Sequence, residues 1–159
     1  NDLAFQNIGE ALALKSNFTD ALFLKAQIEV SSNNIVAAVK SVEDATLIDP
    51  NNAGLYFQLG LLKYNQKDWK GAVASFERAV TLVNDYANAK YFLGLSYQKV
   101  GRNDDEIKQF EDIAITNPDN QEVKDIITNL KAGRAPFANV PPPNNKPEAR
   151  KKPPINEEQ

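Results

Sequence analysis

The sequence contains no cysteine and no histidine. Without cysteine there is no disulfide, no thiol nucleophile and no thiolate metal ligand. Without histidine the commonest general base and the commonest metal ligand of proteins are missing too. The remaining side chains show no spacing typical of a catalytic site, and the acidic run Asp104–Glu106 opens a predicted helix, where negative charge favours the helix dipole. We therefore expect no enzymatic activity, no cofactor and no metal site.

Long apolar runs and methionine are also lacking. No apolar run approaches the roughly 18 residues of a transmembrane helix, and no charged-then-apolar leader is present. A chain that begins at Asn1 and contains no methionine is expected to be a fragment or a processed product. The formal net charge of −3 argues against nucleic acid or an anionic membrane as the main partner, because both attract a basic face.

What the sequence does contain is a pattern that repeats every 34 residues. Small residues recur at this period in two registers, one with Ala38 and Ala72 and one with Ala26, Gly60 and Gly94. Bulky apolar residues recur in two more registers, which are Ile8, Val42, Phe76 and Phe110, and Leu59, Leu93 and Ile127. A fixed period of about 20–50 residues indicates helix pairs that bury their apolar faces by stacking on copies of themselves.

Apolar residues at three- and four-residue spacing predict the helices themselves. The expected helices cover residues 2–15, 19–31, 34–48, 53–65, 69–82, 87–100, 103–116 and 120–132. Asn33 and Gly101 fall in the tight turns within repeats, where both tolerate a positive φ. Lys67 occupies the equivalent place in the middle repeat, where we expect mild backbone strain.

The chain divides into a repeat region and a tail. Residues 1–132 are expected to form the array, as a half repeat 1–18, repeats 19–52, 53–86 and 87–120, and an amphipathic capping helix 120–132. Residues 133–159 are rich in proline and asparagine and are expected to be disordered. Gly133 and Pro136 mark the boundary, since glycine favours a left-handed helix end and proline blocks continuation.

The residues at this period resemble the tetratricopeptide repeat (TPR) family. Residues 53–86 carry the pattern most fully, and the matching positions of three repeats are Leu22, Ala26, Ala38, Ala45 and Pro50; Tyr56, Leu59, Gly60, Ala72, Phe76 and Ala79; and Leu93, Gly94, Tyr97, Phe110 and Pro118. The resemblance implies an all-α, right-handed superhelical TPR solenoid of antiparallel helix pairs with a disordered, Pro-rich C-terminal tail. Glu106, Lys25 and Lys90 depart from the pattern at positions that are normally apolar, which predicts looser packing in the first and third repeats.

By the same resemblance, the first helices of successive repeats line a concave groove. The implied partner-binding residues are Phe23, Gln27, Phe57, Leu61, Tyr64, Tyr91, Leu95 and Gln98. Phe23, Phe57 and Tyr91 lie one period apart and are expected to form an aromatic ladder suited to a peptide with apolar anchors. Aromatic residues at this register also serve as packing residues in the family, so a structural role stays open. Trp69 is expected to pack between two helices in its turn.

One groove type in this family holds the C-terminal carboxylate of a chaperone with a clamp of Lys, Asn and Arg residues. The equivalent positions here lack cations, and they are Phe23, Gln27, Phe57, Leu61, Asn88 and Leu95. The resemblance therefore argues against that ligand.

The leading hypothesis is a non-catalytic scaffold that binds a protein or peptide partner in the groove. The alternative is a structural spacer or self-stacking module at the C-terminal end of a longer protein, membrane-anchored or enzymatic. Self-association through the N-terminal half repeat is expected because Phe5 and Leu12 lack a covering helix. An enzyme whose catalytic part lies upstream is a third hypothesis, from family analogy alone. The lack of a long apolar run predicts a soluble segment, and a bacterial origin is expected from the family's abundance alone. The compartment, cytoplasmic or associated with the cell envelope, stays open.

Overall fold

The computed structural model describes residues 18–138, and in this part of the chain it contains helices and no strand. The helices are α2 (Phe18–Ser31), α3 (Ile35–Ile48), α4 (Ala53–Asn65), α5 (Trp69–Leu82), α6 (Ala87–Lys99), α7 (Asn103–Thr116) and α8 (Gln121–Lys131). These bounds agree with the predicted helices to within one residue at every end. The helix predicted over residues 2–15, including Phe5 and Leu12, lies outside the described residues, as does the tail from residue 139 onward.

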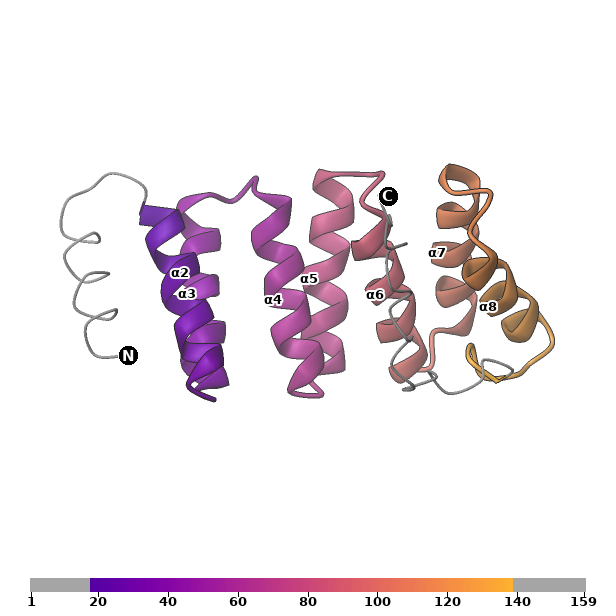
Figure 1. The fold of residues 1–159 in the computed structure, drawn as a ribbon, viewed down its shortest axis with the longest axis horizontal. Coiled ribbons are helices and arrows are strands. Elements are labelled where there is room, and N and C mark those ends of the chain that lie inside the picture. The colour runs from indigo at the N-terminus through magenta and orange to yellow at the C-terminus, as the bar shows by residue number, and fades with distance from the viewer. Residues whose placement is uncertain (1–17, 139–159) are drawn as a thin grey trace, which may run out of the picture.

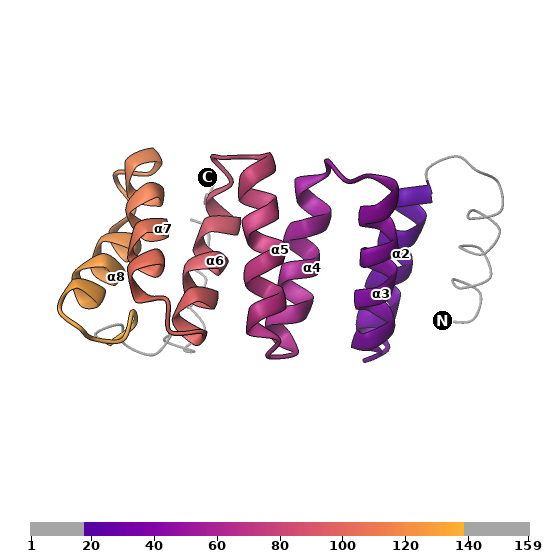
Figure 2. The same cartoon turned by 180° about the vertical axis from the view of Figure 1, so that it is seen from behind.

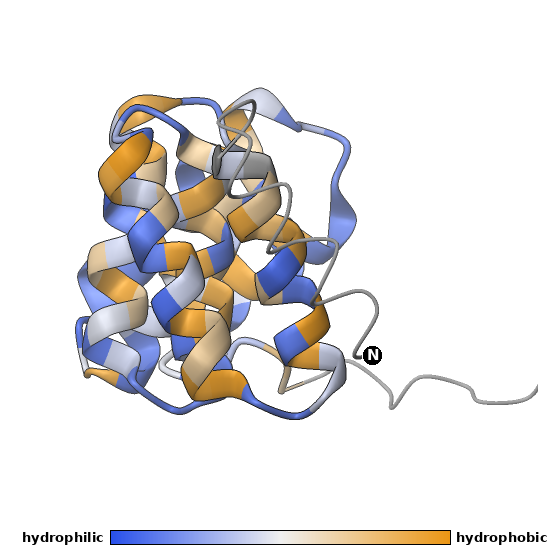
Figure 3. Ribbon diagram, turned by 90° about the vertical axis from the view of Figure 1, so that its left-hand side faces the viewer, coloured by the Kyte–Doolittle hydropathy of each residue, from blue (hydrophilic) through white to orange (hydrophobic). Residues whose placement is uncertain are grey.

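The helices form a single-file array of antiparallel pairs (Figures 1 and 2). Each helix packs on the next one in the chain, and α4 also touches α6. The turns within the pairs α2/α3, α4/α5 and α6/α7 lie along one edge, the lower edge in Figure 1, and the turns between pairs lie along the opposite edge. Seen from the side of α2 and α3, hydrophobic and hydrophilic residues are interspersed along the helices (Figure 3).

Close helix contacts depend on the small residues of the period. Ala38 and Ala72 are fully buried. A Cβ atom added at Gly60 would lie 2.4 Å from the Phe76 ring, and one at Gly94 would lie 2.8 Å from the ring of Phe110. The bulky residue of each second helix therefore occupies the space that glycine leaves in the first helix.

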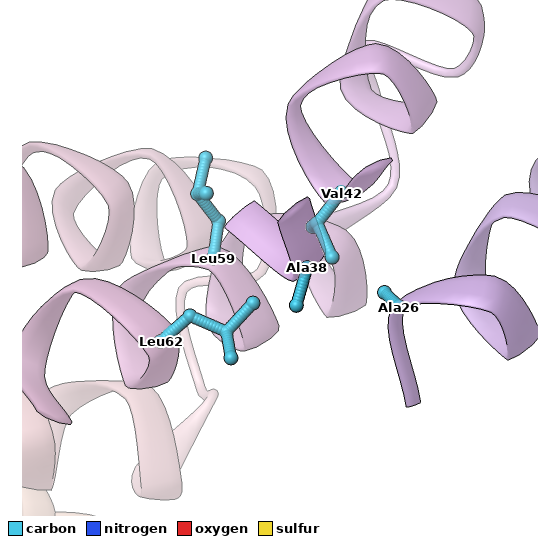
Figure 4. Close-up of a cluster of buried hydrophobic side chains, with 5 residues drawn as sticks. All are labelled: Ala26, Ala38, Val42, Leu59 and Leu62. Atoms are coloured by element: carbon cyan, nitrogen blue, oxygen red, sulfur yellow. The ribbon is translucent and has the colours of Figure 1, made fainter. Parts of the chain in front are cut away.

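The first and second pairs share a core cluster. It consists of Ala26, Ala38, Val42, Leu59 and Leu62 (Figure 4). Because these residues come from α2, α3 and α4, the pairs are joined by a continuous apolar core, as in a stacked repeat protein.

Side-chain caps begin most of the helices. Asn34, Asn52, Asp68 and Asn120 each accept a backbone N–H bond from the first turn of α3, α4, α5 and α8. The turns within the pairs take the predicted left-handed geometry, since Asn33, Lys67 and Gly101 have φ values of 58°, 62° and 77°. Lysine at this position is strained because its Cβ crowds the backbone.

The polar residues at apolar positions have mixed environments. Lys90 is 5% exposed and pairs with Asp112 at 3.6 Å. Lys25 pairs with Glu29 at 3.5 Å, and Glu29 also accepts a bond from the Ser41 hydroxyl. These two departures from the pattern are thus compensated by ion pairs.

The body continues a few residues past α8. Gly133 has a φ of 68° and ends the helix as predicted. The Arg134 backbone N–H donates to the Asn129 carbonyl, and the Asn129 side-chain amide donates to the carbonyl of Pro136, which is buried. Residues 133–136 therefore pack on the end of α8.

Candidate partner-binding face

The predicted groove residues lie on α2, α4 and α6, the first helices of the three pairs; we call this surface the α2–α4–α6 face. Gln27 is exposed and Leu95 is buried, and the others are half-buried, namely Phe23, Phe57, Leu61, Tyr64, Tyr91 and Gln98. Leu61 and Tyr64 pack against the core cluster around Phe76. Some residues of this face therefore pack in the core, and others are open to solvent.

The aromatic residues of this face form a cluster. The Phe57 ring centroid lies 5.0 Å from that of Tyr86 and 6.0 Å from that of Phe92, and Phe92 lies 5.8 Å from Tyr91. Phe57 and Tyr91 of the predicted ladder are thus connected through Phe92. Phe23 packs instead with the separate cluster of Leu22, Ala45 and Leu55.

Tyr91 of α6 is held by two neighbouring helices. Its ring lies 5.5 Å from Phe110 of α7, and its hydroxyl donates to Glu122 Oε1 of α8 at 3.0 Å. Burial, followed by the bond to the Glu122 carboxylate, raises the pKa of Tyr91 to about 12. Because its ring and hydroxyl are both engaged, Tyr91 serves packing in this arrangement.

A hollow of about 240 Å³ opens beside Phe23. It is lined by Thr19, Phe23, Asn52, Gly54, Leu55, Gln58 and Tyr86, and we call it the α2–α4 hollow. Phe23, Leu55 and Tyr86 supply apolar and aromatic walls. Among the described residues, the side-chain amide of Gln58 has no hydrogen-bond partner, so it can both donate to and accept from a ligand. The apolar walls suit one apolar side chain of a peptide ligand, and the Gln58 amide suits the ligand's backbone next to that side chain.

Sequence reasoning missed Tyr86, Phe92 and Gln58. Tyr86 lies one period from Asn52 and Asn120, and both of these cap a helix through their side chains. Tyr86 is the N-cap residue of α6 and makes no side-chain cap bond, while its ring contacts Phe57. An aromatic residue at a capping position was the available signal.

At the other end of the face, Gln98 lines a cavity of about 220 Å³. Glu106, Leu130 and Arg134 line it as well. Glu106 is 1% exposed, and its Oε1 atom has no hydrogen-bond partner. Burial raises the pKa of Glu106 to about 7, and the nearby charge of Lys99 opposes this shift.

Residues 18–138 lack two further features. In this range no group of three or more acidic residues is placed to hold a metal ion. None of the helices described is long and apolar enough to cross a bilayer.

The fold defines a class of helical repeat protein, and comparisons with known proteins agree with it. Residues 53–86, the range that the period outlines for the middle repeat, match a family model described as a tetratricopeptide repeat. Residues 53–86 are thus a tetratricopeptide repeat, and the predicted all-α TPR solenoid fold is confirmed.

Solved structures of other proteins share this fold. MamA has a TM-score of 0.71 and 23% identity, over 79% of this chain and 74% of that one. The first TPR of Spaghetti (RPAP3), bound to the HSP90 peptide SRMEEVD, has a TM-score of 0.66 and 17% identity, over 72% and 91%. A tetratricopeptide repeat protein from Parabacteroides merdae has a TM-score of 0.70 and 20% identity, over 74% and 47%. No curated protein sequence matches.

Proposed function

We propose that this protein is a non-catalytic interaction scaffold that binds a peptide segment of a partner on the α2–α4–α6 face. The observation that carries the proposal is the α2–α4 hollow, where Phe23 and Tyr86 provide aromatic walls beside the Gln58 amide. A hollow of about 240 Å³ accommodates one large apolar side chain of a ligand. The peptide bound to the RPAP3 repeat supports peptide recognition as something this fold can do.

The ligand we propose differs from that chaperone peptide. Gln27 is exposed on α2, and Gln58 lies at the hollow on α4. Neutral amides donate to and accept from a peptide backbone, whereas a terminal carboxylate calls for cations. We therefore expect an internal peptide segment with an apolar anchor. Leu61, Tyr64 and Gln98, which are half-buried, extend the contact surface toward α6 and α8, whereas Leu95 is buried beneath it.

A random peptide library, selected for binding to this protein, tests the proposal. Selected peptides should contain an aromatic or large aliphatic residue. Their titration should perturb the backbone NMR signals of Phe23, Gln27 and Gln58 more than those of α3, α5 and α7. Perturbations centred on these second helices would contradict the proposal.

Tyr86→Asn is the sharpest variant, because it removes a wall of the hollow and restores a helix cap. The new cap contributes about 1 kcal/mol, which offsets a lost ring contact with Phe57 of similar size. With Phe23→Ala added, peptide affinity should fall at least about tenfold, since buried aromatic anchors dominate such contacts. Leu47→Ala, at a side chain 81% exposed on α3, is the control and should leave affinity unchanged.

A further inference from the structure

A second pair of hollows lies at the edge formed by the turns within the helix pairs (lower edge in Figure 1). One, of about 380 Å³, is lined by Lys67, Asp68, Trp69, Lys70, Lys99 and Val100. The other, of about 270 Å³, is lined by Lys70, Val73, Val100 and Arg102. Because Lys70 and Val100 line both, the hollows adjoin; we call this surface the lysine edge.

The charge at the lysine edge is uncompensated. Lys67, Lys70 and Lys99 are exposed, and none of them forms an ion pair with another described residue. Asp68 is the acidic residue of the lining, and its carboxylate accepts the Gly71 N–H as the cap of α5. Within the lining, three ammonium groups therefore share one carboxylate that is already engaged. Lys99 also lies near the Glu106 carboxyl, so Lys67 and Lys70 are the least compensated of the three.

Arg102 does not add to this free charge. Its guanidinium pairs with Glu77 at 3.2 Å and with Asp105 at 2.7 Å, and it lies over the ring of Tyr97. The three lysines are thus the cations available to a ligand at this edge.

An apolar wall accompanies the lysines. Trp69 is half-buried and meets the ring of Tyr64 edge to face at 5.0 Å, which fixes the indole in place. Val73 is 7% exposed and Val100 is half-buried. A ligand at this edge therefore finds apolar surface next to positive charge.

The lysine edge is a local feature of the middle turn and its neighbour. One period earlier, the positions of Lys67, Lys70 and Lys99 hold Asn33, Val36 and Asn65. Lys67 also keeps a φ of 62°, where a side-chain-bearing residue costs about 1 kcal/mol. A strained residue that also bears an uncompensated charge points to a role in binding.

We infer that the lysine edge is a second docking site, which takes an acidic peptide segment with an apolar side chain beside its Asp or Glu residues. The carboxylates would pair with the lysines, and the apolar side chain would pack against Trp69 and Val100. A short acidic segment fits better than a nucleic acid or a membrane, because the chain as a whole has a net charge of −3 and repels extended polyanions. This site is separate from the α2–α4 hollow.

The test uses a synthetic octapeptide in which Leu-Phe is flanked by Glu and Asp residues. The chain has one tryptophan, so its emission reports on this edge alone. We expect the octapeptide to shift the Trp69 emission and to bind more weakly as salt rises, whereas its Gln/Asn analogue should not bind. Lys67→Ala with Lys70→Gln should lower affinity about tenfold or more.

Matched variants separate the site from general charge effects. Lys40→Gln with Lys108→Gln removes the same charge from exposed positions elsewhere and should change affinity by less than about twofold. Lys67→Gly should weaken binding while relieving the strained turn, so unfolding cannot account for that loss. Tyr86→Asn should leave binding of the octapeptide unchanged.

The inference is wrong if the octapeptide does not bind at millimolar concentration, or if its neutral analogue binds equally well. It is also wrong if the Lys40/Lys108 control loses as much octapeptide affinity as the Lys67/Lys70 variant, or if Tyr86→Asn loses octapeptide affinity. Tighter binding of an oligothymidylate or of phosphatidylserine vesicles, with the same lysine dependence, would replace the peptide by a polyanion. The peptides selected for the α2–α4 hollow are measured separately, so failure of the octapeptide at the lysine edge leaves the proposed function untouched.

Discussion

The middle helix pair, α4/α5, and the last pair, α6/α7, follow one pattern and depart from it at opposite places. In the middle pair the core position holds Ala72, and the turn holds Lys67 at a φ of 62°. In the last pair the equivalent core position holds Glu106, and the turn holds Gly101, which suits its φ of 77°. The middle pair has an apolar core position and a strained turn, whereas the last pair has a buried carboxyl group in its core and an unstrained turn.

The difference shows which position of each helix pair tolerates a departure from the repeat pattern. In a stacked array each pair contacts only its neighbours, so a departure in one pair leaves the geometry of the rest intact. Residues that break a local rule also mark sites with another role. Lys67 belongs to the lysine edge, and Glu106 lines the cavity of about 220 Å³ beside Arg134.

The largest expected effect concerns the core of the last pair. Glu106 has a raised pKa in the folded protein, so its contribution to stability is full below about pH 4.5 and is lost as pH rises through about 7. Glu106→Gln should therefore gain stability over the parent as pH rises, by up to about 3 kcal/mol at pH 8. Urea unfolding of both proteins between pH 4 and pH 8 measures the difference.

Two cations near Glu106 limit the size of this effect. Lys99 lowers the pKa of the carboxyl, and Arg134 lines the same cavity. Asp44→Asn, which removes a carboxyl group from an exposed position of α3, is the control and should change stability by no more than about 0.5 kcal/mol. A constant difference between Glu106→Gln and the parent would rule out a perturbed carboxyl.

The next effect compares the same register in the two pairs. Ala72→Leu should destabilise the protein by about 1–3 kcal/mol, because the residue is fully buried between α4 and α5. Glu106→Leu should be neutral or stabilising at neutral pH, since it removes a buried carboxyl with an unpartnered oxygen. Thermal unfolding gives the melting temperature of each variant. A shift of the same sign in both would contradict the difference between the two core positions.

Much of the fold follows from the sequence because the period constrains backbones directly. The period puts Gly60 and Gly94 in one small-residue register, and Phe76 and Phe110 of the bulky register lie against them in the structure. The strain at Lys67 was predicted from its place in the turn and is present. Backbone rules of this kind depend on residue size and spacing, which a single sequence displays.

The side-chain environment was harder to predict. The α2–α4 hollow and the link of Phe57 to Tyr91 through Phe92 depend on rotamers and on contacts between separate pairs. The lysine edge was missed for a similar reason, because Lys70 and Lys99 are distant in sequence and meet only when α5 and α6 pack. The period indicates which residues face a neighbour, and it does not indicate how their side chains fill the space.

The smallest expected effect tests the turn of the middle pair. Lys67→Gly should stabilise the protein by about 0.5–1 kcal/mol, because glycine adopts the left-handed conformation without a Cβ clash, less the entropy it adds to the unfolded chain. Lys67→Ala removes the same charge and keeps the clash, so it should gain nothing. Chemical denaturation of the two variants separates backbone strain from charge, and an equal gain in both would assign the effect to the lost ammonium group instead.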